Sequence, residues 1–542
     1  MIQYYIINND SRANQYGIGT YINQMAQGLL ALHVYHVTCI DLCSEVKELT
    51  CTEDEYGIRR VKIPRTNERI EDEIYCRTAY YLLQQFIKGK DDNIIFHFNY
   101  FQHYDLARML KARFIQSKII LSIHYLNWCF EINGNLTRFK EIITTQHTPT
   151  DDLERKILID FQQTSRFLRF ADEIIVLSQY TLNVVENDYH IRKDKLHLIY
   201  NGFSKTTSTT DVPLWTDSGI QQILFVGRLD SIKGVNYLIK AFRKTNTKHP
   251  KTRLVLVGDG DFPTYLNLCN GIWDKVIFTG KVSKEILENI YRHTTIGVLP
   301  SFHEQCSYSA IEMMSHGIPM IVSDSTGLQE MMNEWPELIA HISETQFSEE
   351  NYIEQIVERI DILLSDEDKR KKVSQSLKKS YENKYTEKAM IQAFDKIIIK
   401  SIKATQSHIS EMFLTDIDDR MIYYINTRPD IDIDFYGMTG IGAYLWWRIE
   451  NGNHLKEDAY SLYLQEYLIY YLDWLHETVE QAPTTVADQK EMSYLLQSMR
   501  KYNFYPTRID TILSYFPHKE ELKIWSTTQL LSNALKIYNC NL

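Results

Sequence analysis

Short apolar runs alternate with longer segments of helical period along the first 400 residues, and this alternation constrains the fold more than any other feature. Runs rich in β-branched and aromatic residues are typical of buried strands, and their alternation with helices predicts a largely parallel sheet. The first set lies at 2–7, 36–41, 58–63, 93–98, 118–124, 173–178 and 196–200. A second set lies at 222–227, 253–258, 275–280, 295–299, 319–323 and 337–342. The sequence therefore predicts two successive α/β domains.

Changes in composition predict the domain boundaries. A polar, Ser/Thr-rich stretch around 203–221 separates the two sets of runs and is typical of a linker. We predict a first α/β domain at 1–205, a second at 206–385, and a helix at 386–405 that crosses back to the first domain. Beyond 405 the strand signals disappear, and aromatic-rich segments of helical period predict a mostly helical extension at 406–542.

The overall charge argues against two classes of partner. Fifty-nine Lys and Arg residues against 70 Asp and Glu residues give a net charge of -11, which opposes attraction to nucleic acids and to anionic lipid surfaces. A basic run of Arg108, Lys111, Arg113 and Lys118 leaves peripheral membrane contact open. An ordinary amphipathic surface helix is the favoured interpretation of this run.

Cysteine usage and hydropathy predict a cytoplasmic protein. The eight cysteines are scattered, without a CxxC pair or His/Cys zinc spacing, and are interpreted as free thiols in a reducing compartment. No apolar stretch of 18 residues occurs, and the N-terminus lacks the basic region and cleavage site of a signal peptide.

Two strand-to-helix turns carry residues suited to an anion. Gly17 and Gly19 follow the first apolar run and open a helical segment, where backbone N–H groups and the helix dipole favour negative charge. A common tight turn is an equally good interpretation. Arg228 and Lys233 follow the run at 222–227, at the edge of the sheet where α/β proteins bind ligands. Two fixed cations there suit a diphosphate, with exposed surface cations as the alternative.

The segment at 300–319 carries two carboxylates at a suggestive spacing. Glu304 lies in the loop after the run at 295–299, and Glu312 lies about one turn into the next helix. Carboxylates so separated can accept hydrogen bonds from hydroxyls at different ends of a sugar nucleotide. The backbone amides from Gln305 to Tyr308, at the start of that helix, are suited to phosphate.

In their order and spacing these segments resemble the GT4-type retaining glycosyltransferases, which have the two-domain GT-B fold. The resemblance rests on the following segments: Glu304-x7-Glu312, Gly227 to Gly234, Val257-Gly258-Asp259-Gly260, Phe278-Thr279-Gly280, His316-Gly317-Ile318-Pro319, Gly17-Ile18-Gly19, Ser122-Ile123-His124, Val176-Leu177-Ser178 and Tyr200-Asn201-Gly202. It spans about 1–400 and implies two Rossmann-like domains that face a cleft.

The resemblance implies roles for the cations and carboxylates. Arg228 and Lys233 would hold the donor diphosphate and neutralise the charge that grows on the leaving group. Glu304 would bind hydroxyls of the transferred sugar, and Glu312 would accept a hydrogen bond from the ribose. His124 would face the reacting sugar and the acceptor, whereas taken alone it would be interpreted as a buried core histidine.

The resemblance also implies roles for glycines and for the helix start. Gly17 and Gly19 would close over the phosphates, Gly227 would lie beside the donor, and Gly280 would line the base pocket. Family members often carry Gly-Phe-Gly where this chain has Gln305-Cys306-Ser307, a departure that leaves the donor open. These residues and Tyr308 are assigned to donor binding. Cys306 is interpreted as a small buried side chain, with a reactive thiol as the alternative.

The expected reaction is sugar transfer from a UDP- or GDP-sugar to a glycan, a lipid-linked acceptor or a peptide. It would retain the anomeric configuration by front-face attack and would need no bound metal or other cofactor. The alternatives are another GT-B enzyme, such as a phosphorylase or sugar-phosphate synthase, and a non-catalytic scaffold that binds a partner through its helical tail.

The C-terminal region carries two further patterns. The runs 416–419 and 430–434 resemble the DxD motif of metal-dependent transferases, but they lie far along the chain from the sugar-nucleotide motifs and are predicted to be solvated acidic loops. The glycines from Gly437 to Gly442 weakly resemble the helix starts of lanthionine-cyclase-like toroids. Because the zinc ligands of true cyclases are missing, no cyclase activity is predicted.

Overall fold

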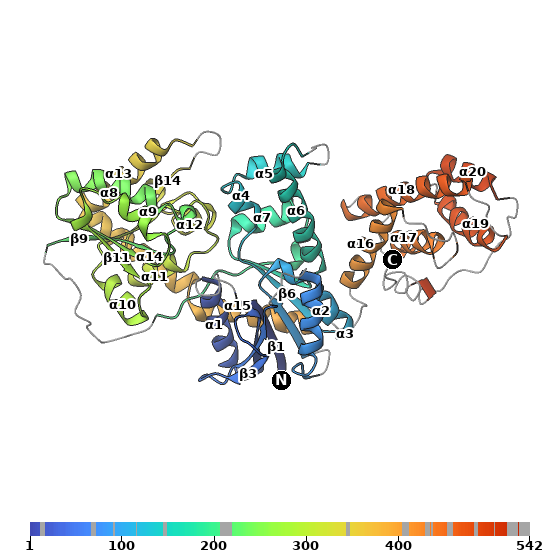
Figure 1. Ribbon diagram of the computed structural model, residues 1–542, viewed down its shortest axis with the longest axis horizontal. Coiled ribbons are helices and arrows are strands. Elements are labelled where there is room, and N and C mark those ends of the chain that lie inside the picture. Colours follow the sequence, from blue (N-terminus) through green and yellow to red (C-terminus); the bar gives the residue numbers. More distant parts are fainter. Residues whose placement is uncertain are drawn as a thin grey trace. The chain divides into compact units, whose positions relative to one another are not determined.

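The computed structural model describes most of the chain as two compact units, Met1–Ser407 and His408–Leu542 (Figure 1). The described residues are 1–10, 17–66, 72–89, 93–114, 116–144, 149–205, 219–342, 347–403, 411–428, 434, 437–451, 459–481, 486–502, 504–516 and 529–530. The predicted linker at 203–221 lies largely outside them.

The first domain is built on an eight-stranded sheet with the order β3-β4-β2-β1-β5-β6-β7-β8. Its strands are β1 (Ile2–Asn9), β2 (Tyr35–Ser44), β3 (Thr50–Glu53), β4 (Arg59–Pro64), β5 (Ile94–Phe98), β6 (Lys118–Ile123), β7 (Glu173–Val176) and β8 (Leu196–Leu198). All neighbours pair in parallel except β3, which pairs antiparallel with β4. The predicted runs are confirmed as strands, and β3 was missed because it is a mostly exposed edge strand without an apolar run.

Seven helices connect and cover this sheet in the described part of the first domain. They are α1 (Gly17–Leu30), α2 (Asp72–Leu83), α3 (Tyr104–Arg113), α4 (Trp128–Glu131), α5 (Leu136–Ile143), α6 (Asp152–Phe170) and α7 (Gln179–Asn187). Helix α1 buries its apolar face, including Tyr21 and Met25, because these residues recur at helical spacing. This packing holds the start of α1 at the carboxyl end of β1.

The second domain repeats the design with a six-stranded parallel sheet of order β11-β10-β9-β12-β13-β14. Its strands are β9 (Gln221–Val226), β10 (Thr252–Val257), β11 (Val276–Gly280), β12 (Ile296–Leu299), β13 (Met320–Ser323) and β14 (Ile339–Ala340). Its helices are α8 (Val235–Lys248), α9 (Phe262–Asn267), α10 (Lys284–Arg292), α11 (Tyr308–His316), α12 (Thr326–Met331), α13 (Glu349–Ser365) and α14 (Glu367–Lys384). The expected pair of Rossmann-like sheets is thereby confirmed.

Strand order places a ligand-binding edge in each sheet. The chain turns from one side of the sheet to the other beside β1 in the first domain and beside β9 in the second. In open α/β sheets, ligands bind at the carboxyl ends of the strands at such switch points. The carboxyl ends of β1, β9 and β12 are therefore the positions where a site is expected.

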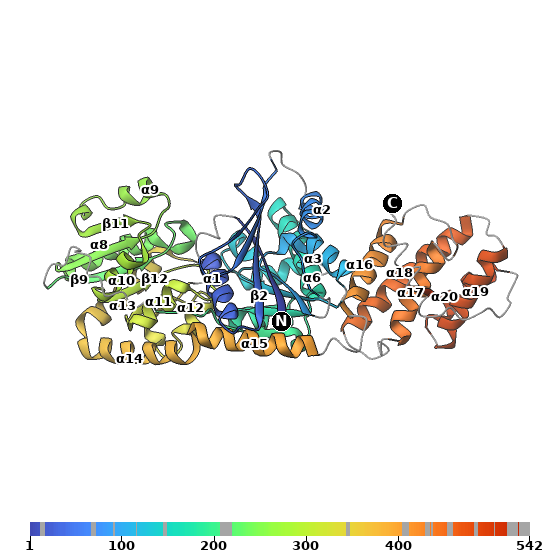
Figure 2. The same ribbon diagram turned by 90° about the horizontal axis from the view of Figure 1, so that it is seen from below.

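Helix α15 (Glu387–Lys403) ties the two domains together. It packs against α1, as Figure 2 shows, and Phe394 and Ile398 are fully buried there. The Tyr35 hydroxyl also donates a hydrogen bond of 2.5 Å to Asp395. The helix thus returns from the second domain to the first.

The second unit is helical throughout its described part and has its own apolar core. Its helices are α16 (Glu411–Thr427), α17 (Met438–Asn451), α18 (Ala459–Gln481), α19 (Val486–Lys501) and α20 (Pro506–Ser514). Gly442 lets α17 approach α18, because a Cβ atom there would meet the Tyr471 ring at 2.3 Å. The resemblance to cyclase-like toroids stays a prediction.

Candidate active site

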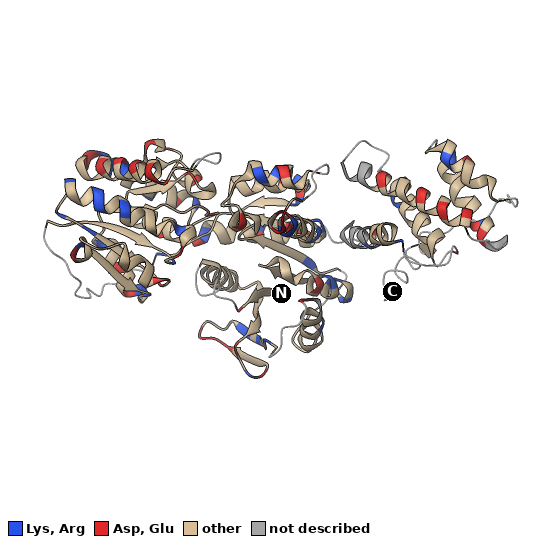
Figure 3. Cartoon of the chain, turned by 45° about the horizontal axis from the view of Figure 1, so that its top comes forward, with Lys and Arg blue, Asp and Glu red and all other residues tan. Residues whose placement is uncertain are grey.

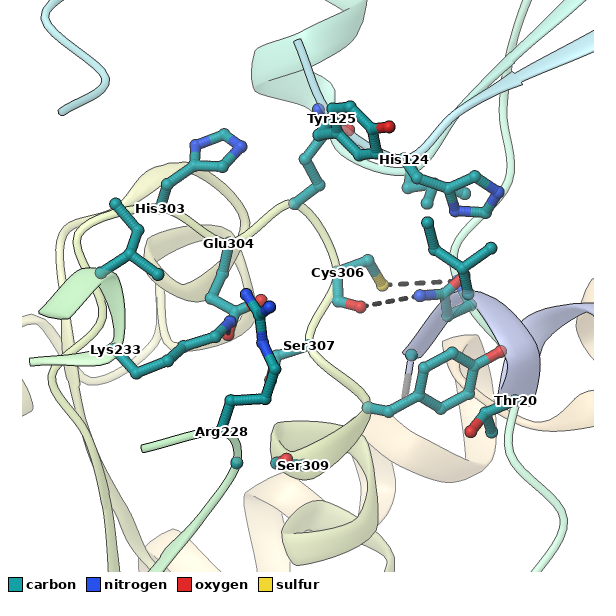
Figure 4. Close-up of a pocket in the computed structure, with 18 of the residues that line it drawn as sticks. Thr20, His124, Tyr125, Arg228, Lys233, His303, Glu304, Cys306, Ser307 and Ser309 are labelled. Carbon is teal, nitrogen blue, oxygen red and sulfur yellow. Dashed lines mark hydrogen bonds and ion pairs between the residues drawn. The ribbon is translucent and has the colours of Figure 1, made fainter. Parts of the chain in front are cut away.

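A cavity of about 540 Å³ lies where the two switch points of the first unit meet. Its walls come from both α/β domains (Figure 4). The first domain contributes Gly17, His124, Tyr125 and Phe130, among others. The loops after β9 and β12 and the start of α11 form the other wall. Segments that are far apart in the sequence are thereby brought to one cavity.

The turn after β9 presents both predicted cations to this cavity. Arg228 forms an ion pair of 3.0 Å with Asp230, and Lys233 ends a short 3-10 helix, Ser231–Lys233. Gly234 follows with a φ of 68°, and a Cβ atom there would lie 2.1 Å from the Pro300 carbonyl oxygen. Only glycine allows so close an approach of the β9 and β12 loops.

Lys233 and Glu304 contact each other directly. The Lys233 ammonium lies 2.5 Å from Glu304 Oε1, and both side chains are largely buried. The Glu304 backbone is fixed from α12, because its carbonyl accepts hydrogen bonds from the Gly327 amide at 2.8 Å and from the Thr326 hydroxyl. Lys233, predicted to bind phosphate, and Glu304, predicted to bind the sugar, are thus neighbours, and hydrogen bonds from α12 hold the Glu304 loop in place.

The start of α11 provides the predicted phosphate-binding amides and the second glutamate. Ser307 caps the helix by accepting a hydrogen bond of 3.4 Å from the Ala310 amide. Glu312 lines the cavity and accepts a hydrogen bond of 2.5 Å from the Tyr291 hydroxyl. Burial raises the pKa of Glu312 to about 7. A small change in its surroundings can therefore change its charge near neutral pH.

His124 lies at the end of β6, as predicted, and lines the first-domain wall. Its Nε2 lies 2.9 Å from Asn99 Oδ1, while Asn99 Nδ2 donates to the Ile7 carbonyl at 3.2 Å. Because the Asn99 amide is oriented by Ile7, its oxygen accepts from a protonated Nε2. Burial lowers the pKa of His124 to about 3, so the ring is neutral and Nδ1 carries a lone pair.

Most of the predicted site residues line the same cavity. These are Gly17, His124, Gly227, Arg228, Lys233, Glu304, Gln305, Cys306, Ser307, Tyr308 and Glu312. Gly19 and Gly280 are not among its lining residues. Gly17 begins α1, and Gly19 is buried inside this helix. The two glycines were expected to form a loop, and they belong to the helix instead. Gly280 ends β11, two strands from the switch point at β9, and its role at a base pocket stays a prediction.

Cys306 is a buried structural residue. Its Sγ accepts a hydrogen bond of 3.3 Å from the Asn201 amide, and its carbonyl accepts one of 2.7 Å from Asn201 Nδ2. Burial raises the pKa of the thiol well above its ordinary range, which is the opposite of activation. The contact joins the two domains beside the cavity.

Four polar side chains of the cavity wall have atoms without a hydrogen-bond partner in the described structure. The atoms are both ring nitrogens of His303, both amide atoms of Gln305, the Tyr308 hydroxyl and Asn201 Oδ1. Buried polar atoms of native proteins are normally paired, so such a group at one cavity indicates a polar ligand. Sequence reasoning assigned Gln305 and Tyr308 but missed His303, which immediately precedes the first glutamate of the motif.

Comparison with known proteins identifies the family. The family described as Glycosyl transferases group 1 matches residues 216–380, and Glycosyltransferase Family 4 matches residues 16–206. The chain belongs to the GT4-type glycosyltransferases.

Individual relatives agree with this assignment. An uncharacterized glycosyltransferase of Methanocaldococcus jannaschii is 33% identical over 174 residues, 30% of this chain and 44% of that protein. The mannosylfructose-phosphate synthase of Agrobacterium fabrum is 28% identical over 272 residues, 47% of this chain and 58% of the synthase. The chain thus spans about half the length of these curated relatives.

A solved structure agrees with the GT-B fold. The sucrose-phosphate synthase of Thermosynechococcus elongatus covers 74% of this chain and 100% of its own, with a TM-score of 0.58 and 17% identity. At this identity the likeness concerns the fold alone.

The structure corrects one expectation about the charged segments of this glycosyltransferase. Asp418 does not lie in a solvated acidic loop, because it is buried within α16 and paired with Arg448. Asp430 lies outside the described residues. In the basic run, Arg108, Lys111 and Arg113 lie on α3, which buries Leu106 and Leu110 as an amphipathic helix does, while Lys118 begins β6 and Lys111 is buried against Asp172. No helix in the described parts of the chain is long and apolar enough to cross a membrane.

Charged residues of opposite sign pair on the surface of the second domain. Acidic and basic residues occur on the same helices (Figure 3), and α8 and α13 are linked by three ion pairs, Lys240–Glu349, Lys244–Glu354 and Lys248–Asp361. The charges of these three α8 lysines are thereby neutralised by carboxylates. Among the described residues, no three His, Cys, Asp or Glu side chains form a metal-binding group.

Proposed function

We propose that this glycosyltransferase transfers a sugar from a nucleotide-sugar donor, UDP- or GDP-linked, to an acceptor hydroxyl with retention of configuration. The observation that carries the proposal is the Lys233–Glu304 pair in a cavity at both switch points, with Arg228 beside it. In a sugar diphosphate the phosphates pair with cations, and the adjoining sugar hydroxyls donate hydrogen bonds to a carboxylate, so the two kinds of residue are expected close together.

The second-domain wall suits the donor. Arg228, Lys233 and the amides at the start of α11 can surround the diphosphate, since the helix dipole adds to the positive field. Glu312 lies one turn into α11 and, as a carboxylate, can accept from ribose hydroxyls. When the diphosphate takes Lys233, Glu304 becomes available to hydroxyls of the transferred sugar.

The chemistry in this proposal is front-face attack. The acceptor oxygen bonds to the anomeric carbon on the face from which the diphosphate leaves, and a donor phosphate oxygen takes the acceptor proton. Negative charge grows on the diphosphate during this step, where Arg228 and Lys233 lower its energy. Neutral His124 can accept a hydrogen bond from a sugar hydroxyl through Nδ1. No metal takes part in the proposed steps.

A sugar-phosphate synthase is the second candidate, because the mannosylfructose-phosphate synthase is among the relatives. It differs from the first candidate in its acceptor, a sugar phosphate. A non-catalytic scaffold is disfavoured, since binding a partner through the helical unit does not require Arg228, Lys233, Glu304 and Glu312 in one cavity.

The test is a thermal-shift and hydrolysis screen of the full chain against UDP-, GDP- and ADP-sugars. A ligand that binds only the folded state raises its apparent stability. We expect stabilisation by one donor, with the shift lost in Lys233→Met and retained in Lys240→Met, whose lysine pairs with Glu349 on the outer surface. Donor turnover with EDTA present tests the metal-independent step. No response to any donor would reject the proposal.

A further inference from the structure

His303 is the least satisfied side chain of the cavity. It follows β12, only 5% of it is exposed, and neither ring nitrogen has a hydrogen-bond partner among the described residues. Burial and the nearby charge of Lys233 lower the pKa of His303 to about 4. The ring is therefore neutral, with one N–H donor and one lone-pair acceptor that have no protein partner among the described residues, and His303 lines the cavity.

One aromatic residue of the first domain contacts this histidine, and a second packs on the first. The Phe130 ring, from α4, lies 5.6 Å from the His303 ring at an interplanar angle of 80°, and Tyr125 lies 5.5 Å from Phe130. Phe130 is 44% exposed although it lines the cavity. Figure 4 places His303 and Tyr125 at one end of the site and Arg228 and Ser309 at the other.

A pyranose ring matches these three side chains chemically. Its axial C–H bonds form an apolar face that can pack on an aromatic ring, and each hydroxyl both donates and accepts. A neutral imidazole can donate to one hydroxyl and accept from its neighbour. An isolated phosphate would gain only one hydrogen bond from this ring and no charge.

We propose that His303, Phe130 and Tyr125 form an acceptor subsite for an uncharged pyranose, with His303 hydrogen-bonded to two adjacent hydroxyls. This inference rests on the proposed function, because the donor is assigned there to Arg228, Lys233 and the start of α11, which leaves His303 to the acceptor. Arg228 and Lys233 are the only Lys or Arg residues among the described lining residues, and the donor diphosphate engages both. The subsite thus recognises a neutral sugar rather than a sugar phosphate.

Direct binding of simple sugars to the full chain tests the inference without any donor. The probes are the methyl α-D-pyranosides of glucose, mannose and galactose and the corresponding hexose 6-phosphates, titrated by saturation-transfer NMR. We expect at least one methyl pyranoside to bind, with about tenfold weaker binding in His303→Phe and in Phe130→Leu. His303→Gln, which keeps a donor and an acceptor, should restore most of the affinity.

Two comparisons keep the outcome interpretable. Phe130 is exposed, so Phe130→Leu tests the subsite even where a buried His303 variant fails to fold, and Tyr81→Leu is its matched control on α2, 67% exposed and away from the cavity. The inference is overturned if no methyl pyranoside binds, if only the 6-phosphates bind, or if the Phe130 and Tyr81 variants weaken binding equally.

Donor titrations separate this inference from the proposed function. A wild-type chain that binds a nucleotide sugar but no pyranoside contradicts the acceptor subsite alone. A chain that binds a pyranoside through His303 but no nucleotide sugar contradicts the proposed function alone. Equal weakening of donor and pyranoside in His303→Phe would place His303 in the donor subsite and overturn the inference.

Discussion

The Lys233 ammonium lies 2.5 Å from a carboxylate oxygen of Glu304, so the two groups assigned to donor binding neutralise each other before the donor arrives. Both side chains are more than four-fifths buried, and the contact is therefore only weakly screened by salt. In the proposed function the donor separates this pair, and its diphosphate and sugar hydroxyls then supply a new partner for each residue.

Removing Glu304 is expected to affect nucleotide binding and turnover in opposite directions. In Glu304→Gln the lysine no longer has a competing carboxylate, so UDP or GDP without a sugar should bind about three- to tenfold more tightly, about 1 kcal/mol. Donor turnover should fall at least roughly 100-fold, because the sugar loses its carboxylate partner. Calorimetric titration and donor hydrolysis check both effects. Lys233→Met should weaken nucleotide binding, and weaker binding in Glu304→Gln would contradict the exchange of partners.

Glu312 should make donor binding depend on pH near neutrality. Its pKa is raised to about 7, so the carboxylate that is proposed to accept from ribose is lost as pH falls through 7, and the donor KM should rise severalfold between pH 8 and pH 6. Glu312→Gln should have a nearly constant KM over this range. KM values measured every half pH unit test this, and an unchanged slope in the variant would assign it to another group.

The raised pKa of Glu312 should make folding stability fall as pH rises, whereas donor binding should strengthen as pH rises. Because the folded state holds this proton more tightly than the unfolded state, the stabilisation is present below pH 4.5 and is lost as pH rises through 7. Glu312→Gln should therefore gain up to about 3 kcal/mol relative to wild type at pH 8 and little at pH 4.5. Denaturant unfolding at the two pH values measures the difference. A constant difference would show that Glu312 does not carry the raised pKa.

Much of the fold could be predicted because parallel strands are buried on both faces and leave continuous apolar runs. β3 was missed because an exposed edge strand has no such run. Arg228, Lys233 and Glu304 could be placed because each lies in the segment between a predicted strand and the next helix. The close contact of Lys233 and Glu304 could not, since it depends on β9 and β12 being neighbours in the sheet.

The remaining residues that the sequence-based predictions misplaced or missed depend on contacts between segments distant in the sequence. The acidic run at 416–419 has the composition of a solvated loop, yet Asp418 is buried because Arg448 reaches it from the next helix. Asn99 follows β5 and gave no signal of its own, because only the pairing of β5 with β6 brings it beside His124. His303 precedes a motif residue, and its lack of a partner is a property of the packed cavity rather than of spacing.

Asn99 is expected to set the protonation of His124. In Asn99→Asp a carboxylate faces Nε2, so the pKa of His124 should rise from about 3 toward its ordinary range. Protonation removes the lone pair on Nδ1, and on the acidic side kcat should therefore begin to fall at a higher pH than in wild type. Rate profiles from pH 5 to 9 measure this. The double variant Asn99→Asp/His124→Gln should lose the added acidic limb, and its persistence would assign the titration to the introduced carboxylate rather than to the histidine.

The buried Asp418–Arg448 pair should control the stability of the helical unit alone. The two side chains are 0% and 2% exposed, and Arg448 donates to both carboxylate oxygens at 2.8–3.1 Å. Arg448→Met leaves a buried carboxylate without its partner, which costs about 3–5 kcal/mol. The exposed pair Arg428–Glu477 lies in the same unit, so Arg428→Met is a matched control and should cost less than about 1 kcal/mol.

Calorimetry of the full chain measures both variants. The unfolding transition of the helical unit should move to lower temperature in Arg448→Met, while donor-induced stabilisation of the first unit is retained. If the two Arg variants lose equal unfolding free energy, burial does not increase the contribution of the Asp418–Arg448 pair to stability.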